Sequence, residues 1–362
     1  MIKDVLFQVR QEKVLNVNYR QSLLYGSITI ILLTFGFSNF NQNLFVTADT
    51  PNIVASISIV ADFATQIGEG IFTVESIVSG SENPHIYEPT PSEIEAVASA
   101  DLFIMLGLDD LEPWVEAVLL ANPDVPVLVL VNPSMMRYDP LIDADNPHVW
   151  MDPMIVKQMV EKIYDEVILV DSINAATYQT NKNNYLTELD DLSDLINTTK
   201  IEFQGLNVVV HHPSLMYLLD LLNVTRIGVI EEHEGEEPSP EHIAEIIADI
   251  EEHNVSIIIN QPQLDEGEII EIARDTGIQI ADLTPLLGVP DIEGFVQAQG
   301  RIIDNYIKMI EYNLEALKNP HDPPKIGDVV TFWTMVSLGS AGIVGTLIVV
   351  AIVRLKKRKE IP

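Results

Sequence analysis

The chain contains no cysteine among its 362 residues. This absence excludes disulfides, thiolate metal sites, iron–sulfur clusters, a cysteine nucleophile and a lipid-modified cysteine anchor. Basic residues are also scarce, with 20 Lys and Arg against 54 Asp and Glu, so the net charge is −34. Such a surface repels phosphates, which argues against general nucleic-acid binding. Any metal site in this chain therefore depends on His, Asp and Glu side chains.

Two long uncharged apolar segments predict the topology of the chain. The first extends from about Leu23 to Phe37 and follows a segment that contains four basic residues. An apolar core of about 15 residues after basic residues is typical of a signal peptide. Small residues up to Ala48 favour cleavage there, and an uncleaved anchor is the alternative. We therefore interpret residues 1–48 as a signal peptide or N-terminal anchor.

The second apolar segment extends from about Phe332 to Val353 and is long enough to cross a hydrocarbon core of about 30 Å. Five basic residues follow it, and by the positive-inside rule they favour a cytoplasmic tail. We expect residues 329–362 to form a transmembrane anchor with a basic cytoplasmic tail. The region between the two segments then lies outside the cytoplasm, and the chain is expected at the cell surface, anchored in the membrane.

The external region alternates between short β-branched segments and amphipathic segments. Residues 49–152 form one β–α–β–α–β series, and residues 203–328 form a second. Such alternation predicts parallel sheets covered by helices. Residues 153–202 contain no glycine and no internal proline, which predicts one long helix between the two lobes. The expected fold class is α/β, with two Rossmann-like lobes with parallel sheets joined by one long bridging helix, plus a C-terminal transmembrane helix.

Several of the 8 histidines lie where strands are expected to end. His85 and His148 lie in loops that lead into helices, whereas His211 and His212 end the expected strand LNVVV. In folds of this kind, ligands bind at the carboxyl ends of the strands, in the crevice between the lobes. One such histidine alone is more often a hydrogen-bonded loop residue. Three histidines that converge would form a common zinc-binding set.

Five segments follow one another from about Gly80 to Leu287. They are GSENPHIYEPTPSEIEAVASADLFIMLGLDDLEPWVE, NPHVWMDP, HPSLMYLLDLLNV, GEEPSPEHIAEII and NQPQLDEGEIIEIARDTGIQIADLTPLL. Together these segments resemble the solute-binding proteins of ABC importers for zinc and manganese, and the resemblance covers most of the external region.

The resemblance implies three metal ligands by their positions in these segments. His85, His148 and His212 match ligands of the family, and His212 rather than His211 lies at the family's distance before Tyr217. Carboxylate-rich sites suit manganese better than imidazole sites do. Three histidines therefore favour Zn²⁺ as the bound ion, with Mn²⁺ as the alternative.

The family's fourth ligand, an acid in an L-D-P-L segment, is replaced in this chain. Thr284 occupies that position. Asp282 is the candidate fourth ligand, and water or an acid from a nearby loop is the alternative. The acidic loop 231–237 also contains His233. We interpret this loop as a solvated turn, with a metal-gathering loop as the alternative.

The resemblance implies a binding protein without enzymatic activity. Such a protein would capture the metal between its lobes and deliver it to an ABC permease, driven by the ATPase of that transporter. One ion needs no second copy of the chain, so a monomer is expected. A surface adhesin with the same fold and a zinc-dependent hydrolase are the alternatives. The chain contains no HExxH pattern, which argues against the hydrolase.

Overall fold

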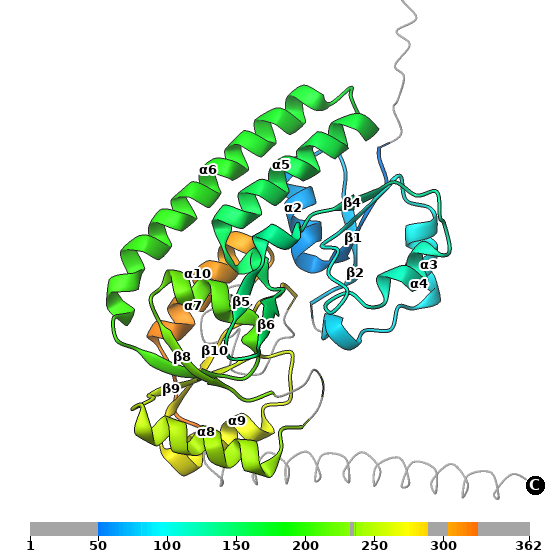
Figure 1. Cartoon of the computed structure of the whole chain (residues 1–362). Helices are drawn as coiled ribbons and strands as arrows, with labels where there is room; N and C mark the ends of the chain where they lie inside the picture. The colour runs from blue at the N-terminus through cyan, green and yellow to red at the C-terminus, as the bar shows by residue number, and fades with distance from the viewer. Residues whose placement is uncertain (1–49, 81, 232–234, 236, 289–302, 325–362) are drawn as a thin grey trace, which may run out of the picture. The chain divides into compact units, whose positions relative to one another are not determined.

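The computed structural model describes residues 50–80, 82–231, 235, 237–288 and 303–324. Within this part of the chain, two four-stranded parallel sheets form the centres of two lobes (Figure 1). Their strand orders are β2-β1-β3-β4 and β10-β9-β7-β8. The predicted pair of parallel α/β lobes is therefore observed. The strands are β1 (Ile53–Ile57), β2 (Val74–Val78), β3 (Leu102–Met105), β4 (Val127–Val129), β7 (Asn207–Val210), β8 (Thr225–Val229), β9 (Ile257–Asn260) and β10 (Gln279–Asp282).

Continuous apolar runs build the central strands of both sheets. All residues of β1 and of β9 are buried. A strand that is covered on both faces needs apolar side chains at successive positions, so these runs do not alternate. In the N-terminal lobe, α2 (Ser58–Gly68) packs on β1 and β2. In the C-terminal lobe, α8 (Pro240–Glu252) packs on β8, and α9 (Gly267–Thr276) packs on β9 and β10.

A short antiparallel hairpin leads into the segment that carries His148 and is hydrogen-bonded to the C-terminal lobe. It consists of β5 (Arg137–Asp139) and β6 (Ala144–Asn146). Further helices complete the two lobes, and the last of them packs against β10 and α2. These helices are α3 (Pro91–Ala98), α4 (Val115–Leu119), α7 (Met216–Leu221) and α10 (Tyr306–Lys318).

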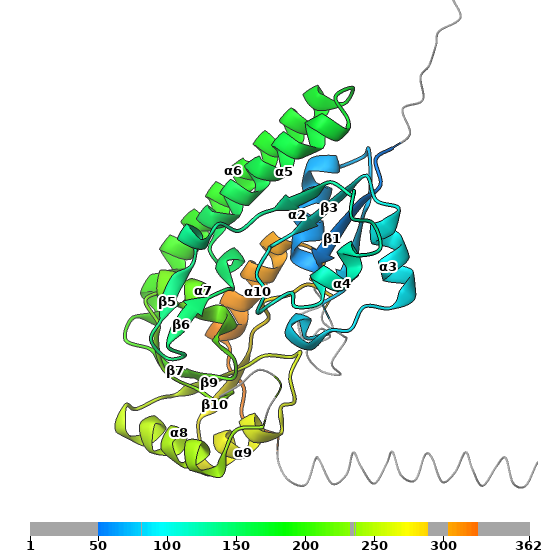
Figure 2. The same cartoon turned by 45° about the vertical axis from the view of Figure 1, so that its right-hand side comes forward.

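Two helices, not one, connect the lobes. Helices α5 (Pro153–Val170) and α6 (Ala175–Thr199) lie side by side and are joined by a short turn (Figures 1 and 2). In the turn, the Asp171 carboxylate accepts hydrogen bonds from the side chains of Asn174 and Tyr178. Local side-chain bonds of this kind compete with the helical backbone pattern. The prediction of one long bridging helix is therefore wrong, because the absence of glycine and internal proline and the helical spacing of apolar residues do not reveal the break at Asp171.

The described part of the chain contains no helix that is long and apolar enough to span a membrane. The C-terminal transmembrane helix of the predicted fold class is therefore not supported, and the fold is corrected to the two lobes and their connecting helices. The predicted anchor at residues 329–362 and the predicted signal segment at residues 1–48 both lie outside the described residues. The domain boundaries stay predictions.

A buried carboxylate joins the N-terminal lobe to the last helix. Asp62 of α2 is 8% exposed, and its Oδ2 accepts a hydrogen bond from the backbone N–H of Tyr306, at the start of α10, at 2.9 Å. Gln66 donates to the other oxygen at 2.8 Å. Burial raises the pKa of Asp62 to about 6, although both hydrogen bonds oppose the shift. The folded chain therefore favours the protonated form of Asp62.

We expect the substitution Asp62→Asn to remove part of the pH dependence of stability. Since the pKa is about 6 in the folded chain and about 3.9 in the unfolded chain, Asp62 should contribute roughly 3 kcal/mol of stability below the unfolded pKa. This contribution is lost as pH rises through the folded pKa. The amide keeps an oxygen acceptor for Tyr306 but does not titrate.

Urea unfolding of both proteins between about pH 4 and pH 7 measures this effect. The other carboxylates titrate in both proteins, so the difference in unfolding free energy isolates Asp62. The wild type should gain stability relative to the variant as the pH falls. A difference that stays constant across this range would contradict the prediction.

Candidate metal centre

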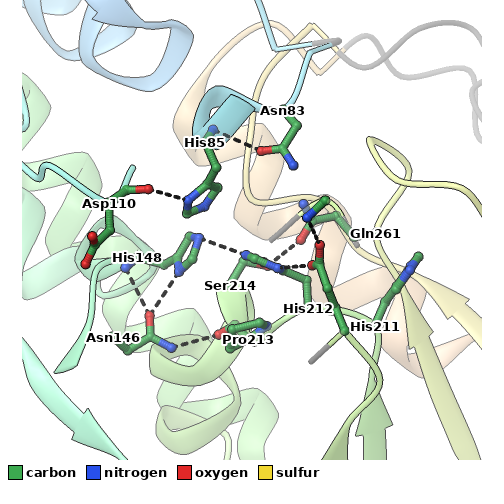
Figure 3. A network of polar contacts seen from close by, with 12 residues as sticks. Asn83, His85, Asp110, Asn146, His148, His211, His212, Pro213, Ser214 and Gln261 are labelled. Atoms are coloured by element: carbon green, nitrogen blue, oxygen red, sulfur yellow. Dashed lines mark hydrogen bonds and ion pairs between the residues drawn. The ribbon is translucent and has the colours of Figure 1, made fainter. Parts of the chain in front are cut away.

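Three histidines from three separate loops converge between the two lobes (Figure 3). His85 lies in a short 3₁₀ turn after β2, His148 lies just beyond β6, and His212 lies just beyond β7. Each histidine offers one ring nitrogen, and these nitrogens lie within 4.8 Å of one another. His85 and His212 lie beyond strands of the two parallel sheets, as the strand-end rule requires, whereas His148 lies beyond a strand of the antiparallel hairpin. Together these three loops bring residues that are far apart in the sequence close to one another.

The orientation of each ring is set by an oxygen acceptor at its Nδ1 atom. A neutral imidazole that donates through Nδ1 carries its lone pair on Nε2, which is the atom that binds a metal. Metal-binding histidines in proteins are commonly oriented in this way. The contacts are His85 Nδ1 to the carbonyl oxygen of Asp110 at 2.7 Å, His148 Nδ1 to Asn146 Oδ1 at 3.0 Å, and His212 Nδ1 to Glu231 Oε2 at 2.6 Å.

The spacing of the rings fits a tetrahedral metal ion. Nε2 of His148 and Nε2 of His212 lie 3.3 Å apart. Two nitrogens bound to Zn²⁺ at 2.0–2.1 Å in a tetrahedron are separated by about 3.3 Å. Two nitrogen lone pairs that face each other at this distance repel, and a cation between them would attract both. The arrangement therefore has both the geometry and the charge requirement of a cation site.

Burial keeps two of the rings neutral at neutral pH. Burial and, to a smaller extent, the nearby His212 together lower the pKa of His85 to about 4. Burial also lowers the pKa of His148 well below its ordinary value, with smaller contributions from His212 and His85. Neutral imidazole is the form that binds a metal, so little proton release is needed at these two rings.

Asp282, the fourth residue predicted from the sequence, is engaged elsewhere. Its Oδ1 accepts a hydrogen bond from Asn260 Nδ2 at 2.7 Å, and its Oδ2 lies 2.8 Å from His321 Nε2. It does not belong to the metal-competent group found among the described residues. Thr284 is fully buried, and its hydroxyl donates to the carbonyl oxygen of Leu286. The Thr284 side chain therefore forms a hydrogen bond within its own loop. The ligand roles of the three histidines and of Asp282 stay predictions.

Sequence reasoning missed the acceptors that orient the rings. Glu231 had been assigned to a solvated acidic turn, yet its carboxylate bonds to His212 and is largely buried. Its position just beyond β8 was the available signal, because the same rule had selected the histidines. Residues 232–234 and 236 of this acidic loop lie outside the described residues.

The three histidines open into an acidic cavity of about 530 Å³. A cavity lined by one sign of charge raises the local concentration of ions of the opposite sign. Its geometry therefore suits the entry of a cation from solvent. The acidic residues of the lining are Asp109, Asp110, Asp145 and Glu231.

Two lobes with parallel sheets, joined by helices and with three converging histidines between them, are the features expected of a metal-binding solute-binding protein. The sequence model of the family described as zinc-uptake complex component A, periplasmic (ZnuA), matches residues 53–320, and the chain belongs to this family. The family consists of metal-binding transport proteins of ABC importers, so the chain is a binding protein and not an enzyme.

Known proteins with similar sequences and structures are consistent with this assignment. The manganese-binding lipoprotein MntA of Halalkalibacterium halodurans is 29% identical over 269 residues, which are 73% of this chain and 86% of that protein. The high-affinity zinc uptake system protein ZnuA of Bacillus subtilis is 25% identical over 287 residues, which are 75% of this chain and 88% of that protein. A crystal structure of ZnuA covers 75% of this chain and 98% of its own, with a TM-score of 0.63 and 25% identity.

Proposed function

We propose that the chain captures Zn²⁺ with His85, His148 and His212 in the cleft between its lobes and delivers it to an ABC permease. The observation that carries the proposal is the separation of 3.3 Å between the Nε2 atoms of His148 and His212. Family membership supports the transport role, because its members are components of metal importers. The proposed location is outside the cytoplasm, where the relatives named lipoproteins and periplasmic proteins act.

The donor atoms favour zinc over manganese. The innermost cavity is lined by the three histidines and by apolar and amide side chains, with no carboxylate among its lining residues in the described chain. Nitrogen donors rank Zn²⁺ well above Mn²⁺, whereas oxygen-rich sites are needed to hold manganese. Relatives are named for either metal, so the local donor set is the stronger argument for this chain.

The proposed transport step requires only binding and release. The three-histidine site takes one ion, which a single copy of the chain can hold, so we propose a monomer. The acidic cavity would attract the cation, and the buried neutral imidazoles would bind it. Release would follow docking to the permease, with the transporter's ATPase supplying the energy.

Metal titration of the purified, metal-free protein tests this function. We expect one Zn²⁺ per chain and an affinity for Zn²⁺ at least about 100-fold above that for Mn²⁺, because of the all-nitrogen donor set. Direct titration with a chelating indicator gives the stoichiometry, and competition between the two metals gives the ratio. Equal affinities, or an excess of Mn²⁺ in the bound fraction at equal concentrations, would contradict the zinc assignment.

A further inference from the structure

Asn146 makes four hydrogen bonds through one buried side-chain amide at the end of β6. Its Oδ1 lies 3.0 Å from both the backbone N and the Nδ1 of His148. Its Nδ2 donates to Asp139 Oδ2 at 3.1 Å and to the carbonyl oxygen of Pro213 at 3.0 Å. Asn146 is fully buried, so water does not compete for these bonds. One side chain thus contacts the loops that carry both His148 and His212.

The partners of the amide determine which way it faces. A carbonyl oxygen and an ionised carboxylate can only accept hydrogen bonds, so the NH₂ group of Asn146 must face Pro213 and Asp139. Its oxygen must then face His148 and can only accept. The proton of the neutral His148 ring must therefore be on Nδ1, which leaves the lone pair on Nε2, the atom that faces His212.

The charge on Asp139 anchors this series of contacts. Burial alone would raise the pKa of Asp139, but the hydrogen bonds and charge of Arg226 hold it below its ordinary value. Arg226, in β8, donates two parallel hydrogen bonds to the carboxylate at 2.8 and 2.9 Å. A guanidinium can only donate hydrogen bonds, so the ionised Asp139 carboxylate acts as the acceptor toward both Arg226 and Asn146. The orientation of the Asn146 amide is therefore fixed before a metal arrives.

We propose that Asn146 is a positioning residue that holds His148 in the Nδ1–H tautomer and ties its ring to the loop of His212. This inference rests on the proposed function, because it assigns the role of the residue at the same metal site. Asn146 acts through His148 and does not bind the ion. Orienting partners of metal-binding histidines commonly contribute 10–100-fold to affinity, so the Asn146 amide should contribute an effect of about that size.

Nitrogen NMR of the metal-free, full chain with ¹⁵N-labelled histidine tests the proposal directly. Loss of one signal in His148→Ala assigns the ring. The wild type should show the Nδ1–H tautomer at His148, and Asn146→Ala should show a mixture of tautomers. Asn146→Asp should retain the Nδ1–H tautomer, because one carboxyl oxygen can accept from the same N–H while the other, protonated beside Asp139, donates in place of Nδ2. Asn146→Ala should also weaken Zn²⁺ binding by about 10–100-fold, with a smaller loss for Asn146→Asp.

Asn122→Ala is the matched control, because Asn122 also donates its side-chain amide to a backbone carbonyl, that of Ala98 at 3.0 Å. This variant should keep the wild-type tautomer and Zn²⁺ affinity. If Asn146→Ala keeps the wild-type His148 tautomer and the wild-type Zn²⁺ affinity, the proposal is overturned. If the alanine variant does not fold, an Nε2–H tautomer of His148 in Asn146→Asp would overturn the proposal instead. Wild-type Zn²⁺ binding by His148→Ala would instead overturn the proposed function, and the tautomer measurement would still decide the role of Asn146.

Discussion

Replacement of His148 by alanine is expected to weaken Zn²⁺ binding by about a thousandfold. Structural zinc sites bind their metal with apparent free energies of about 10–16 kcal/mol. Loss of one of three nitrogen donors should remove roughly a third of that, or about 4 kcal/mol, and each 1.4 kcal/mol corresponds to a factor of ten. The Nε2 atom of His148 faces that of His212, and its ring also lies beside that of His85. Competition with a chelating indicator measures the change in Kd.

His211→Ala provides a matched control for this experiment. His211 is 7% exposed and His148 is 3% exposed, so both substitutions remove a buried imidazole. The Nδ1 atom of His211 lies 3.4 Å from Asn260 Oδ1, and Figure 3 shows its ring apart from the three converging rings. This variant should bind Zn²⁺ within a few-fold of the wild type. Equal losses in the two variants would indicate that general destabilisation, not ligand removal, lowers the affinity.

Local chemistry explains why the lobes could be predicted from the sequence. Runs such as Ile53–Ile57 and Ile257–Asn260 are short and apolar at nearly every position, as is typical of strands that are buried on both faces. The helix break at Asp171 was not predicted, because it depends on hydrogen bonds from Asn174 and Tyr178 rather than on a helix-breaking residue. A strand can be predicted from a run of neighbouring residues, whereas this helix break depends on hydrogen bonds between particular side chains.

In the metal centre, too, the residues could be predicted from the sequence but their contacts could not. The positions of His85, His148 and His212 at expected strand ends or in loops that lead into helices, together with the family segments, were enough to select these residues, and the structure brings them together. Their ring orientations depend on acceptors from other loops, such as Glu231, which no sequence spacing specifies. Asp282 was selected by proximity in sequence to Thr284, but its carboxylate is held by Asn260 and His321.

Replacement of Arg226 by methionine is expected to destabilise the fold by about 3–5 kcal/mol. Asp139 is fully buried, and the side chain of Arg226 is 7% exposed. Removal of one partner leaves an uncompensated charge in the interior. This destabilises the fold by more than the intact ion pair stabilises it. Methionine preserves much of the volume of the arginine stem. Urea unfolding at neutral pH measures the loss, and a loss below about 1 kcal/mol would contradict the prediction.

Two controls separate the buried charge from the loss of a surface interaction. Lys308→Ala removes the exposed ion pair with Asp304, four residues earlier in the chain at the start of α10. This loss should cost no more than about 0.5 kcal/mol. The double variant Asp139→Asn with Arg226→Met removes both buried charges and should recover most of the stability lost in Arg226→Met. Continued loss in the double variant would mean that packing of the guanidinium, not charge, is the cause.

The pH dependence of Arg226→Met gives an independent check on the same argument. Without the guanidinium, burial is opposed only by the hydrogen bonds of Leu141 and Asn146, so the pKa of Asp139 should rise from its lowered value. The deficit relative to wild type should therefore shrink as the pH falls toward the unfolded value of about 3.9. Protonated Asp139 could also donate a hydrogen bond, so the Asn146 amide would lose its fixed orientation. The charge that stabilises the fold at β8 is then the same charge that orients His148.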